Sequence, residues 1–255
     1  MTKPQLSLMD VTRAVADCAR TANFSFGEDT AVVAVQHMLW QTIDLFEALV
    51  ALGIKRENIF ALGKVYSNNS IVIGTLRSRG TNVIESTAAS PGEFDRAFQA
   101  DVDHLWEVVQ QTLAQRRVKR ILILDDGGKC ATTMPGELLA RYAVAGVEQT
   151  SFGMFQFEHS PPPFAVVSWA RSAVKLQIGG PLFSHCLLVK LQSQFLQGKL
   201  LSDENVGIIG LGSIGSALAN LAERQRNNVL FYDPDPRYQI PEYLLGRVTR
   251  VDSLE

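Results

Sequence analysis

A glycine-rich stretch near the end of the chain constrains the fold most strongly. Residues 206–236 read VGIIGLGSIGSALANLAERQRNNVLFYDPDP. The apolar run at 206–209 is typical of a buried parallel strand, and Gly210, Gly212 and Gly215 then follow as G-x-G-x-x-G. The first glycine permits a tight turn, the second lets backbone approach a pyrophosphate, and the third lets helix and strand pack closely. Strand, turn, helix and strand in this order predict a dinucleotide-binding βαβ unit.

The same stretch indicates which ligand the unit binds. The backbone N–H groups of Ser213 and Ile214, where the helix begins, can bind phosphate. Asp233 ends the second strand, where a carboxylate accepts hydrogen bonds from ribose hydroxyls and repels a 2′-phosphate. We therefore predict NAD as the cofactor, in preference to NADP. A glycine turn that serves packing alone and the adenosine part of another cofactor are the alternatives.

Composition bounds the class of protein. A chain of 255 residues with 46% apolar and 20% charged residues can bury the cores of two globular domains. Its net charge of -2 gives no electrostatic reason to expect nucleic acid or an anionic membrane as a partner. Cys18, Cys130 and Cys186 are widely spaced and show no metal-ligand pattern. We expect a reduced, cytoplasmic protein that holds no metal, binds no nucleic acid and does not insert into a membrane.

Before the glycine-rich unit, apolar runs alternate with amphipathic stretches. The runs lie at 31–36, 58–62, 82–86, 120–126 and 164–169, and helical periodicity is clear at 40–52 and 94–115. Strands that alternate with helices are typical of a parallel sheet with helices on both faces. The sequence therefore predicts an α/β fold: a doubly wound N-terminal domain followed by a partial Rossmann domain.

The helical period of residues 181–201 predicts a long helix that joins the two domains. We place the boundary near residue 195, with a substrate-type domain at 1–195 and an NAD-binding unit at 196–255. The closing RVTRVDSLE reads as a third strand, so we expect this unit to be incomplete. A small sheet buries little surface by itself, and we therefore expect it to pack on the N-terminal domain or in a homo-oligomer.

Polar residues follow several predicted strands, and ligands of open α/β sheets bind at the carboxyl ends of strands. His37 follows the first strand, Asp125 and Asp126 end the fourth, and Lys175 follows the fifth. Each alone could be a helix cap, a turn residue or a surface side chain. Together they suit proton-coupled redox chemistry on a small molecule, because they are titratable groups of three different classes.

The blocks VQHMLWQTIDLFEALVALG, ILDDGG, AGVEQTSFG, SAVK and GIIGLGSIGSALANL occur in the order found in S-adenosylhomocysteine hydrolases. The chain resembles that family over roughly residues 30–255. The resemblance implies a substrate domain before an NAD domain, and oxidation of a ribose 3′-hydroxyl by tightly held NAD.

The resemblance also implies roles for individual residues. It gives His37, Asp126 and Lys175 as catalytic acid–base groups. The implied contacts are Gln41, Thr42, Glu148 and Gln149 with substrate, and Thr150 and Ser151 with NAD, beside Gly210, Gly212, Ser213, Ile214, Gly215 and Asp233.

Two departures from that family limit the expected chemistry. Gln149 and Gly179 stand where the family has a glutamate and an aspartate. We therefore expect NAD-dependent oxidation of a nucleoside-like or hydroxylated small molecule rather than the full hydrolase cycle. A non-catalytic NAD- or nucleoside-binding module and an S-adenosylmethionine-dependent transferase are the alternatives.

Overall fold

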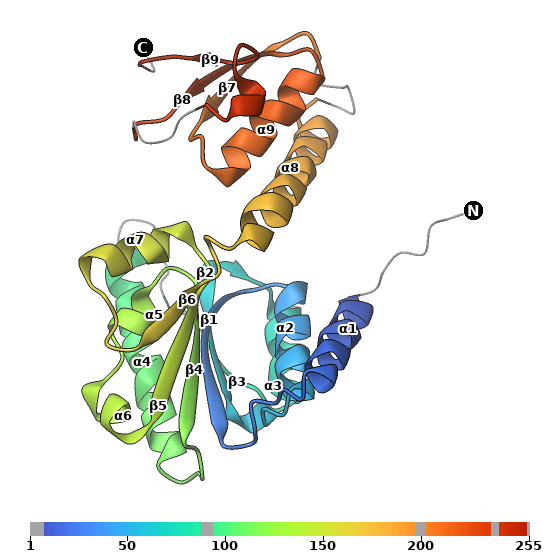
Figure 1. Cartoon of the computed structure of the whole chain (residues 1–255). Helices are drawn as coiled ribbons and strands as arrows, with labels where there is room; N and C mark the ends of the chain where they lie inside the picture. The colour runs from blue at the N-terminus through green and yellow to red at the C-terminus, as the bar shows by residue number, and fades with distance from the viewer. Residues whose placement is uncertain (1–7, 88–93, 197–201, 236–239, 254–255) are drawn as a thin grey trace. The chain divides into compact units, whose positions relative to one another are not determined.

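The computed structural model describes residues 8–87, 94–196, 202–235 and 240–253. The chain forms two compact units, Met1–Ala170 and Arg171–Glu255 (Figure 1). The division comes before the helix α8 (Gly180–Gln194), whereas the sequence pattern placed a boundary near residue 195. The difference arises because α8 packs on a helix of the second unit. Residues 197–201 of the predicted connecting helix lie outside the described residues.

The first unit contains a six-stranded parallel sheet in the order β3-β2-β1-β4-β5-β6. Its strands are β1 (Thr30–Met38), β2 (Ile59–Asn68), β3 (Asn82–Ile84), β4 (Arg120–Asp125), β5 (Ala143–Glu148) and β6 (Ala165–Ser168). The predicted α/β class is confirmed. The sequence pattern missed β5, because Ala143, Ala145 and Gly146 interrupt the apolar, β-branched composition by which the other strands were found.

Helices cover both faces of this sheet because β1 is apolar on both sides. Ala31, Val33 and Val35 face one core and Val32 and Ala34 face the other, as the two-residue period of a strand requires. The first core packs against α4 (Phe94–Leu113), α5 (Lys129–Thr132), α6 (Gly136–Arg141) and α7 (Ser151–His159). The second packs against α2 (Trp40–Ala51) and α3 (Ser70–Ser78), and α1 (Leu8–Thr21) lies on α2.

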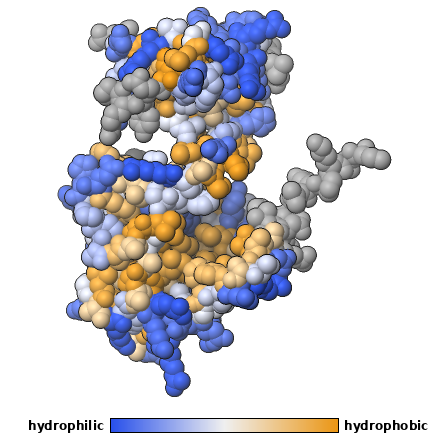
Figure 2. Space-filling view, viewed as in Figure 1, coloured by the Kyte–Doolittle hydropathy of each residue, from blue (hydrophilic) through white to orange (hydrophobic). Residues whose placement is uncertain are grey.

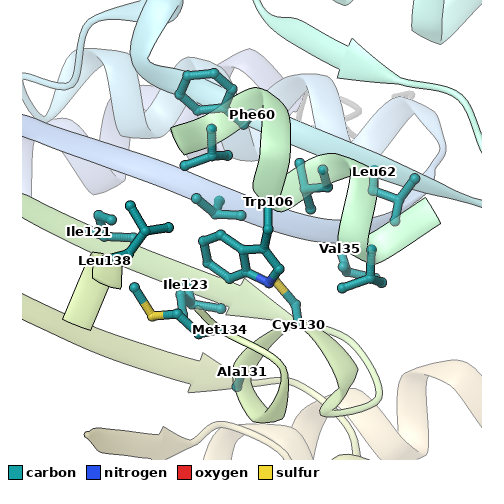
Figure 3. Close-up of a cluster of buried hydrophobic side chains, with 14 of the residues drawn as sticks. Val35, Phe60, Leu62, Trp106, Ile121, Ile123, Cys130, Ala131, Met134 and Leu138 are labelled. Atoms are coloured by element: carbon teal, nitrogen blue, oxygen red, sulfur yellow. The ribbon is translucent and has the colours of Figure 1, made fainter. Parts of the chain in front are cut away.

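Trp106 of α4 lies at the centre of the first core. Figure 3 shows its indole between strand residues such as Val35 and Ile123 and the side chains of Cys130 and Met134. This cluster places α5 against β4 and so fixes the loop that joins them.

The face of the sheet that carries α2 and α3 is less well covered over its other half. Ala145 and Val167 point to that face and are exposed, and Leu122 and Val147 are half-buried. A cavity of about 200 Å³, lined among others by Phe26 and Leu122, lies there. Figure 2 shows the corresponding apolar surface of the first unit.

The second unit holds a three-stranded parallel sheet, β7 (Asn205–Ile209), β8 (Asn228–Tyr232) and β9 (Thr249–Arg250). The helix α9 (Ser213–Arg224) joins β7 to β8, and η4 (Glu242–Leu244) precedes β9. The π-helical turn η3 (Lys175–Gly179) leads into α8, which packs on α9. Small residues permit this packing: the Ser184 hydroxyl donates to the Ile214 carbonyl at 2.9 Å, and a Cβ on Gly180 would meet Ser213.

Within the described part of the chain, no helix is long and apolar enough to cross a membrane.

Candidate functional site

The sheet of the first unit has a topological switch point between β1 and β4. The chain leaves β1 for β2 and β3 on one side of the sheet and later returns to β4 on the other side. Loops that follow β1 and β4 therefore diverge to opposite faces, and in open α/β sheets ligands commonly bind at the carboxyl ends of two such strands. His37 of β1 and Asp126, directly after β4, lie at this point.

Lys64 joins these two residues from β2. Its Nζ forms an ion pair with Asp126 Oδ1, and His37 Nε2 lies 3.7 Å from Asp126 Oδ2. Lys64 is 8% exposed, so this pair is largely removed from solvent. The switch point thus combines a cation, a carboxylate and an imidazole, which we call the Lys64–Asp126–His37 cluster.

A break in the β1–β2 pairing brings Lys64 to the cluster. The register passes from Gln36 opposite Gly63 to Met38 opposite Asn68, so residues 64–67 leave the regular ladder. Sequence analysis missed Lys64. A signal was present, because a charged residue in the apolar strand IFALGKVYSN needs a buried partner.

Ser67, in the same break, favours one position for the proton of His37. The Ser67 hydroxyl donates to the Lys64 carbonyl at 3.3 Å, so its oxygen is free to accept from His37 Nδ1 at 2.6 Å. With the proton on Nδ1, Nε2 holds an unshared electron pair. The arrangement favours a neutral His37 that accepts a proton at Nε2.

Electrostatics support the same protonation state. Burial lowers the pKa of His37 below its ordinary value of 6.5; the Asp126 carboxylate opposes this shift and the Lys64 ammonium adds to it. His37 is therefore unprotonated at neutral pH, as a general base must be.

Two further carboxyl groups lie at the ends of the neighbouring strands. Asp125 and Glu148 are register partners of β4 and β5, and both are buried. Glu148 Oε1 accepts hydrogen bonds from the Gly127 amide at 3.1 Å and from the Thr150 amide at 2.7 Å. Asp125 Oδ2 accepts from the Ala131 amide at 2.8 Å. These hydrogen bonds hold the loop that follows β4 and the loop that follows β5.

Burial is the largest influence on the pKa of both groups. It raises the pKa of Asp125 to about 7 and also raises the pKa of Glu148, while the Thr150 hydroxyl bound to Glu148 opposes the second shift. Glu148 fits beneath the loop because residue 153 is glycine: a Cβ there would lie 2.2 Å from the Glu148 carboxyl carbon.

The other predicted substrate residues occupy different environments. Thr42 is buried, and its hydroxyl donates to the His37 carbonyl, so it fixes the backbone at the end of β1. Gln41 is exposed. The backbone N–H of Gln149 donates to the Asp125 carbonyl at 3.0 Å. A pocket of about 270 Å³ lies beside the Gly127–Gly128 turn, lined also by Lys129, Thr132, Phe152 and Gln156.

The residues predicted to reach NAD from the first unit, Thr150 and Ser151, begin α7. The Thr150 hydroxyl accepts from the Gly153 amide and donates to Glu148, so it caps this helix. Lys175 belongs to the second unit. The roles predicted for these three residues stay predictions.

The glycine-rich loop of the second unit has the expected geometry. Gly210 has a φ of +94°, and a Cβ on Gly215 would lie 1.8 Å from the Gly210 carbonyl oxygen. Asp233 is buried and accepts from the Leu211 amide at 2.6 Å and from the Asp235 amide at 2.9 Å. Asp233 therefore fastens the glycine-rich loop to the end of β8.

This loop fits the phosphates of a dinucleotide. Gly212 precedes α9 and gives no side-chain cap, so the backbone N–H groups of Ser213 and Ile214 are offered to a ligand. Space is open where a Cβ on Gly212 would stand, which permits close approach of a pyrophosphate. A carboxylate has more than one acceptor site on each oxygen, so Asp233 can hold the loop and still accept from ribose hydroxyls.

Comparison with known families identifies the second unit. Residues 188–254 match the model of the NAD-binding domain of D-isomer-specific 2-hydroxyacid dehydrogenases. This match overturns the resemblance to S-adenosylhomocysteine hydrolases, which was wrong, and with it the hydrolase chemistry that the resemblance implied. The glycine-rich block is common to many NAD enzymes and so does not distinguish one family from another. The other blocks were too short and too weakly similar to identify the family.

Two uncharacterized proteins of Mycobacterium tuberculosis, MT0113 (strain CDC 1551 / Oshkosh) and Rv0104 (strain ATCC 25618 / H37Rv), are each 30% identical to the chain over 205 residues. The match covers 79% of this chain and 40% of each relative, so the chain spans well under half of their length.

Among solved structures, D-2-hydroxyisocaproate dehydrogenase is similar with a TM-score of 0.33 and 14% identity, over 87% of this chain and 57% of that one. An acyclic imino acid reductase in complex with NADPH and D-Arg gives a TM-score of 0.33 and 12% identity, over 72% and 57%.

The family match and the loop geometry agree on the cofactor. The glycine spacing, the uncapped start of α9 and the buried Asp233 are the features that the sequence predicted for NAD, and the family match confirms that cofactor. The second unit therefore contains a Rossmann-like NAD-binding domain, and its residues 188–254 resemble the domain found in D-isomer-specific 2-hydroxyacid dehydrogenases.

Proposed function

We propose that this protein is an NAD-dependent oxidoreductase that acts on a neutral, hydroxylated small molecule. The observation that carries the proposal is the Lys64–Asp126–His37 cluster at the switch point of the first sheet. A dehydrogenase needs a cofactor site and a group that moves a proton, and this chain has residues suited to each.

The chemistry divides between cofactor and protein. When bound, NAD⁺ supplies the acceptor for the hydride that leaves the alcohol carbon. His37 Nε2 accepts the hydroxyl proton, so that the alcohol becomes a carbonyl. Asp126 lies close enough to stabilise the imidazolium that forms, and Lys64 holds Asp126 in place. Lys175, in the second unit, is the alternative proton acceptor.

The charges of the cluster favour a neutral substrate over a 2-hydroxy acid. A substrate carboxylate calls for an available arginine or lysine. Lys64, the cation of the cluster, is already paired with Asp126, and the carboxyl groups of Asp125 and Glu148 lie at the neighbouring strand ends. Hydroxyl groups, which donate to carboxylates and to imidazole, suit this site. A nucleoside or a polyol has such groups.

The test is an oxidation assay with the full chain and NAD⁺. We expect NADH absorbance with neutral nucleosides or polyols and none with 2-hydroxy acids of similar size. His37→Asn should lower kcat/KM by about 10²–10⁴-fold, the usual contribution of a general base. The matched control is His104→Asn, since His104 is an exposed histidine of α4 in the same unit.

Two results would contradict the proposal. Turnover of 2-hydroxy acids alone would overturn the substrate class. NAD binding without turnover of either class, with His37→Asn indistinguishable from the native chain in ligand binding, would instead favour a non-catalytic NAD-binding module.

A further inference from the structure

The buried carboxyl groups of Asp125 and Glu148 present a hydrogen-bonding problem that the oxidoreductase proposal does not address. Asp125 Oδ1 and Glu148 Oε2 are both buried, and neither has a hydrogen-bond partner among the residues that the structure describes. Burying one unpartnered carboxylate oxygen is costly, and burying two of them beside each other is more so.

The fold brings the two carboxyl groups to neighbouring positions on adjacent strands. Asp125 and Glu148 are register partners on adjacent strands, so their side chains point to the same face of the sheet. On each carboxyl group the other oxygen is held by backbone: Asp125 Oδ2 by Ala131, and Glu148 Oε1 by Gly127 and Thr150. The two oxygens without partners are therefore the ones left over on neighbouring groups.

We infer that Asp125 and Glu148 hold one proton between them at neutral pH, so that the Asp125 Oδ1 hydroxyl donates to Glu148 Oε2. This one hydrogen bond gives Asp125 Oδ1 an acceptor and Glu148 Oε2 a donor. Glu148 is the better anion of the two, because its Oε1 accepts from two amides and from the Thr150 hydroxyl. The shared proton links the loop after β4 to the loop after β5 and so positions Asp126, the next residue in the chain.

The charges around the pair are consistent with this assignment. Lys64 faces it from β2 but is paired with Asp126, and His37 faces Asp126 from β1. Cys130 of α5 is buried in the same place, and burial together with Asp125 and Glu148 raises the pKa of its thiol. Burial and the Glu148 charge also raise the pKa of Asp125 to about 7.

The first test is a carboxyl ¹³C NMR titration of the full chain with labelled aspartate. We expect one aspartate resonance to titrate near pH 7, and to be absent from Asp125→Asn. In Glu148→Gln that midpoint should fall by about one pH unit or more, the scale that marks coupled sites. The matched control is Asp101→Asn, because Asp101 is a buried carboxylate of the same unit whose two oxygens accept from Ser86 and Thr87.

Two outcomes would overturn the pair. If no aspartate titrates above about pH 5, Asp125 is ionised and carries no shared proton. If the midpoint stays near 7 in Glu148→Gln, burial of Asp125 alone explains it and the two groups do not share a proton.

A second measurement keeps the inference testable if Glu148→Gln does not fold. A carboxyl with a raised pKa in the folded state stabilises the fold fully below its unfolded value and loses that contribution as the pH rises through the folded value. The free energy of unfolding of the native chain should therefore fall between about pH 4 and pH 7, and Asp125→Asn should lack this fall. An equal fall in both proteins would contradict the assignment. Both tests concern the first unit and do not require turnover. The shared proton can therefore be disproved while the oxidoreductase proposal stands, and the oxidoreductase proposal can fail while the shared proton is confirmed.

Discussion

The two parallel sheets of this protein each carry a candidate ligand site at the carboxyl ends of their strands, and the two candidate sites consist of different groups. In the second unit the site is backbone: the turn from Gly210 to Gly215 and the first amides of α9. In the first unit it is side chains, brought by β1, β2, β4 and β5 from far apart in the sequence. A backbone site is sensitive to an added Cβ, whereas a side-chain site is sensitive to the loss of one charge partner.

The largest effect is expected in the side-chain site. Lys64→Met leaves Asp126 without its cation in a buried place and should lower the free energy of unfolding by about 3–5 kcal/mol. It should also raise the pKa of His37, because Lys64 contributes to lowering it. Chemical denaturation and an NMR titration of His37 measure the two effects.

The control for this variant is Lys55→Met, since the Lys55–Glu28 pair lies at the surface. We expect it to change stability little. If both variants lost the same free energy of unfolding, burial would not make the Lys64–Asp126 pair more important for stability than a surface pair. The contrast between the two sites would then be weaker.

Asp233 is the side chain on which the backbone site depends. Asp233→Ala removes the acceptor for the Leu211 amide, and should weaken NAD binding by ~1.5–3 kcal/mol. Calorimetry should also show that the native chain prefers NAD to NADP. Asp252→Ala, at an exposed position, should bind NAD as the native chain does. Equal affinity of the native chain for both cofactors would contradict a ribose-binding role for Asp233.

The glycine-rich turn gives a direct test of sensitivity to a Cβ. Gly215→Ala places a Cβ against the Gly210 carbonyl and should cost about 1–3 kcal/mol, divided between stability and NAD affinity. Gly207→Ala is the matched control, because nothing lies within 4 Å of a Cβ at that position of β7. Calorimetry measures the NAD affinity of both variants, and thermal unfolding measures their stability. Equal losses in Gly215→Ala and Gly207→Ala would contradict the special sensitivity of the glycine-rich turn to a Cβ.

The smallest effect is expected at Ser67. Ser67→Ala removes the acceptor that holds the proton on His37 Nδ1, at a cost of about 1 kcal/mol, so kcat/KM should fall about fivefold. Activity should decline at acid pH in the native chain, with a midpoint below the ordinary histidine value of 6.5, because His37 must be unprotonated and burial lowers its pKa. Ser78→Ala, at an exposed hydroxyl of α3, should leave the pH profile unchanged. An acid limb that is the same in His37→Asn would exclude His37 as the base.

The sequence by itself determined the NAD-binding turn of the second unit. Its turn, helix start and acidic residue follow one another within 24 positions, and each acts through local backbone geometry that glycine spacing reports directly. The α/β class was equally readable, because alternating apolar runs and amphipathic helices leave few other ways to bury both faces of a sheet. The family resemblance was misread: short blocks of similarity pointed to hydrolases, whereas residues 188–254 match the NAD-binding domain of 2-hydroxyacid dehydrogenases.

Only the tertiary structure decided how the first site is assembled. His37 and Asp126 were found from the sequence as strand-end residues, but their link through Lys64 depends on the break in the β1–β2 register, which leaves no mark in the pattern of apolar residues. The pairing of Asp125 with Glu148 depends on β5, a strand whose small residues hid it. Contacts within one turn are set by neighbours in the chain, whereas these contacts are set by strand order and register, and those follow from packing of the whole sheet.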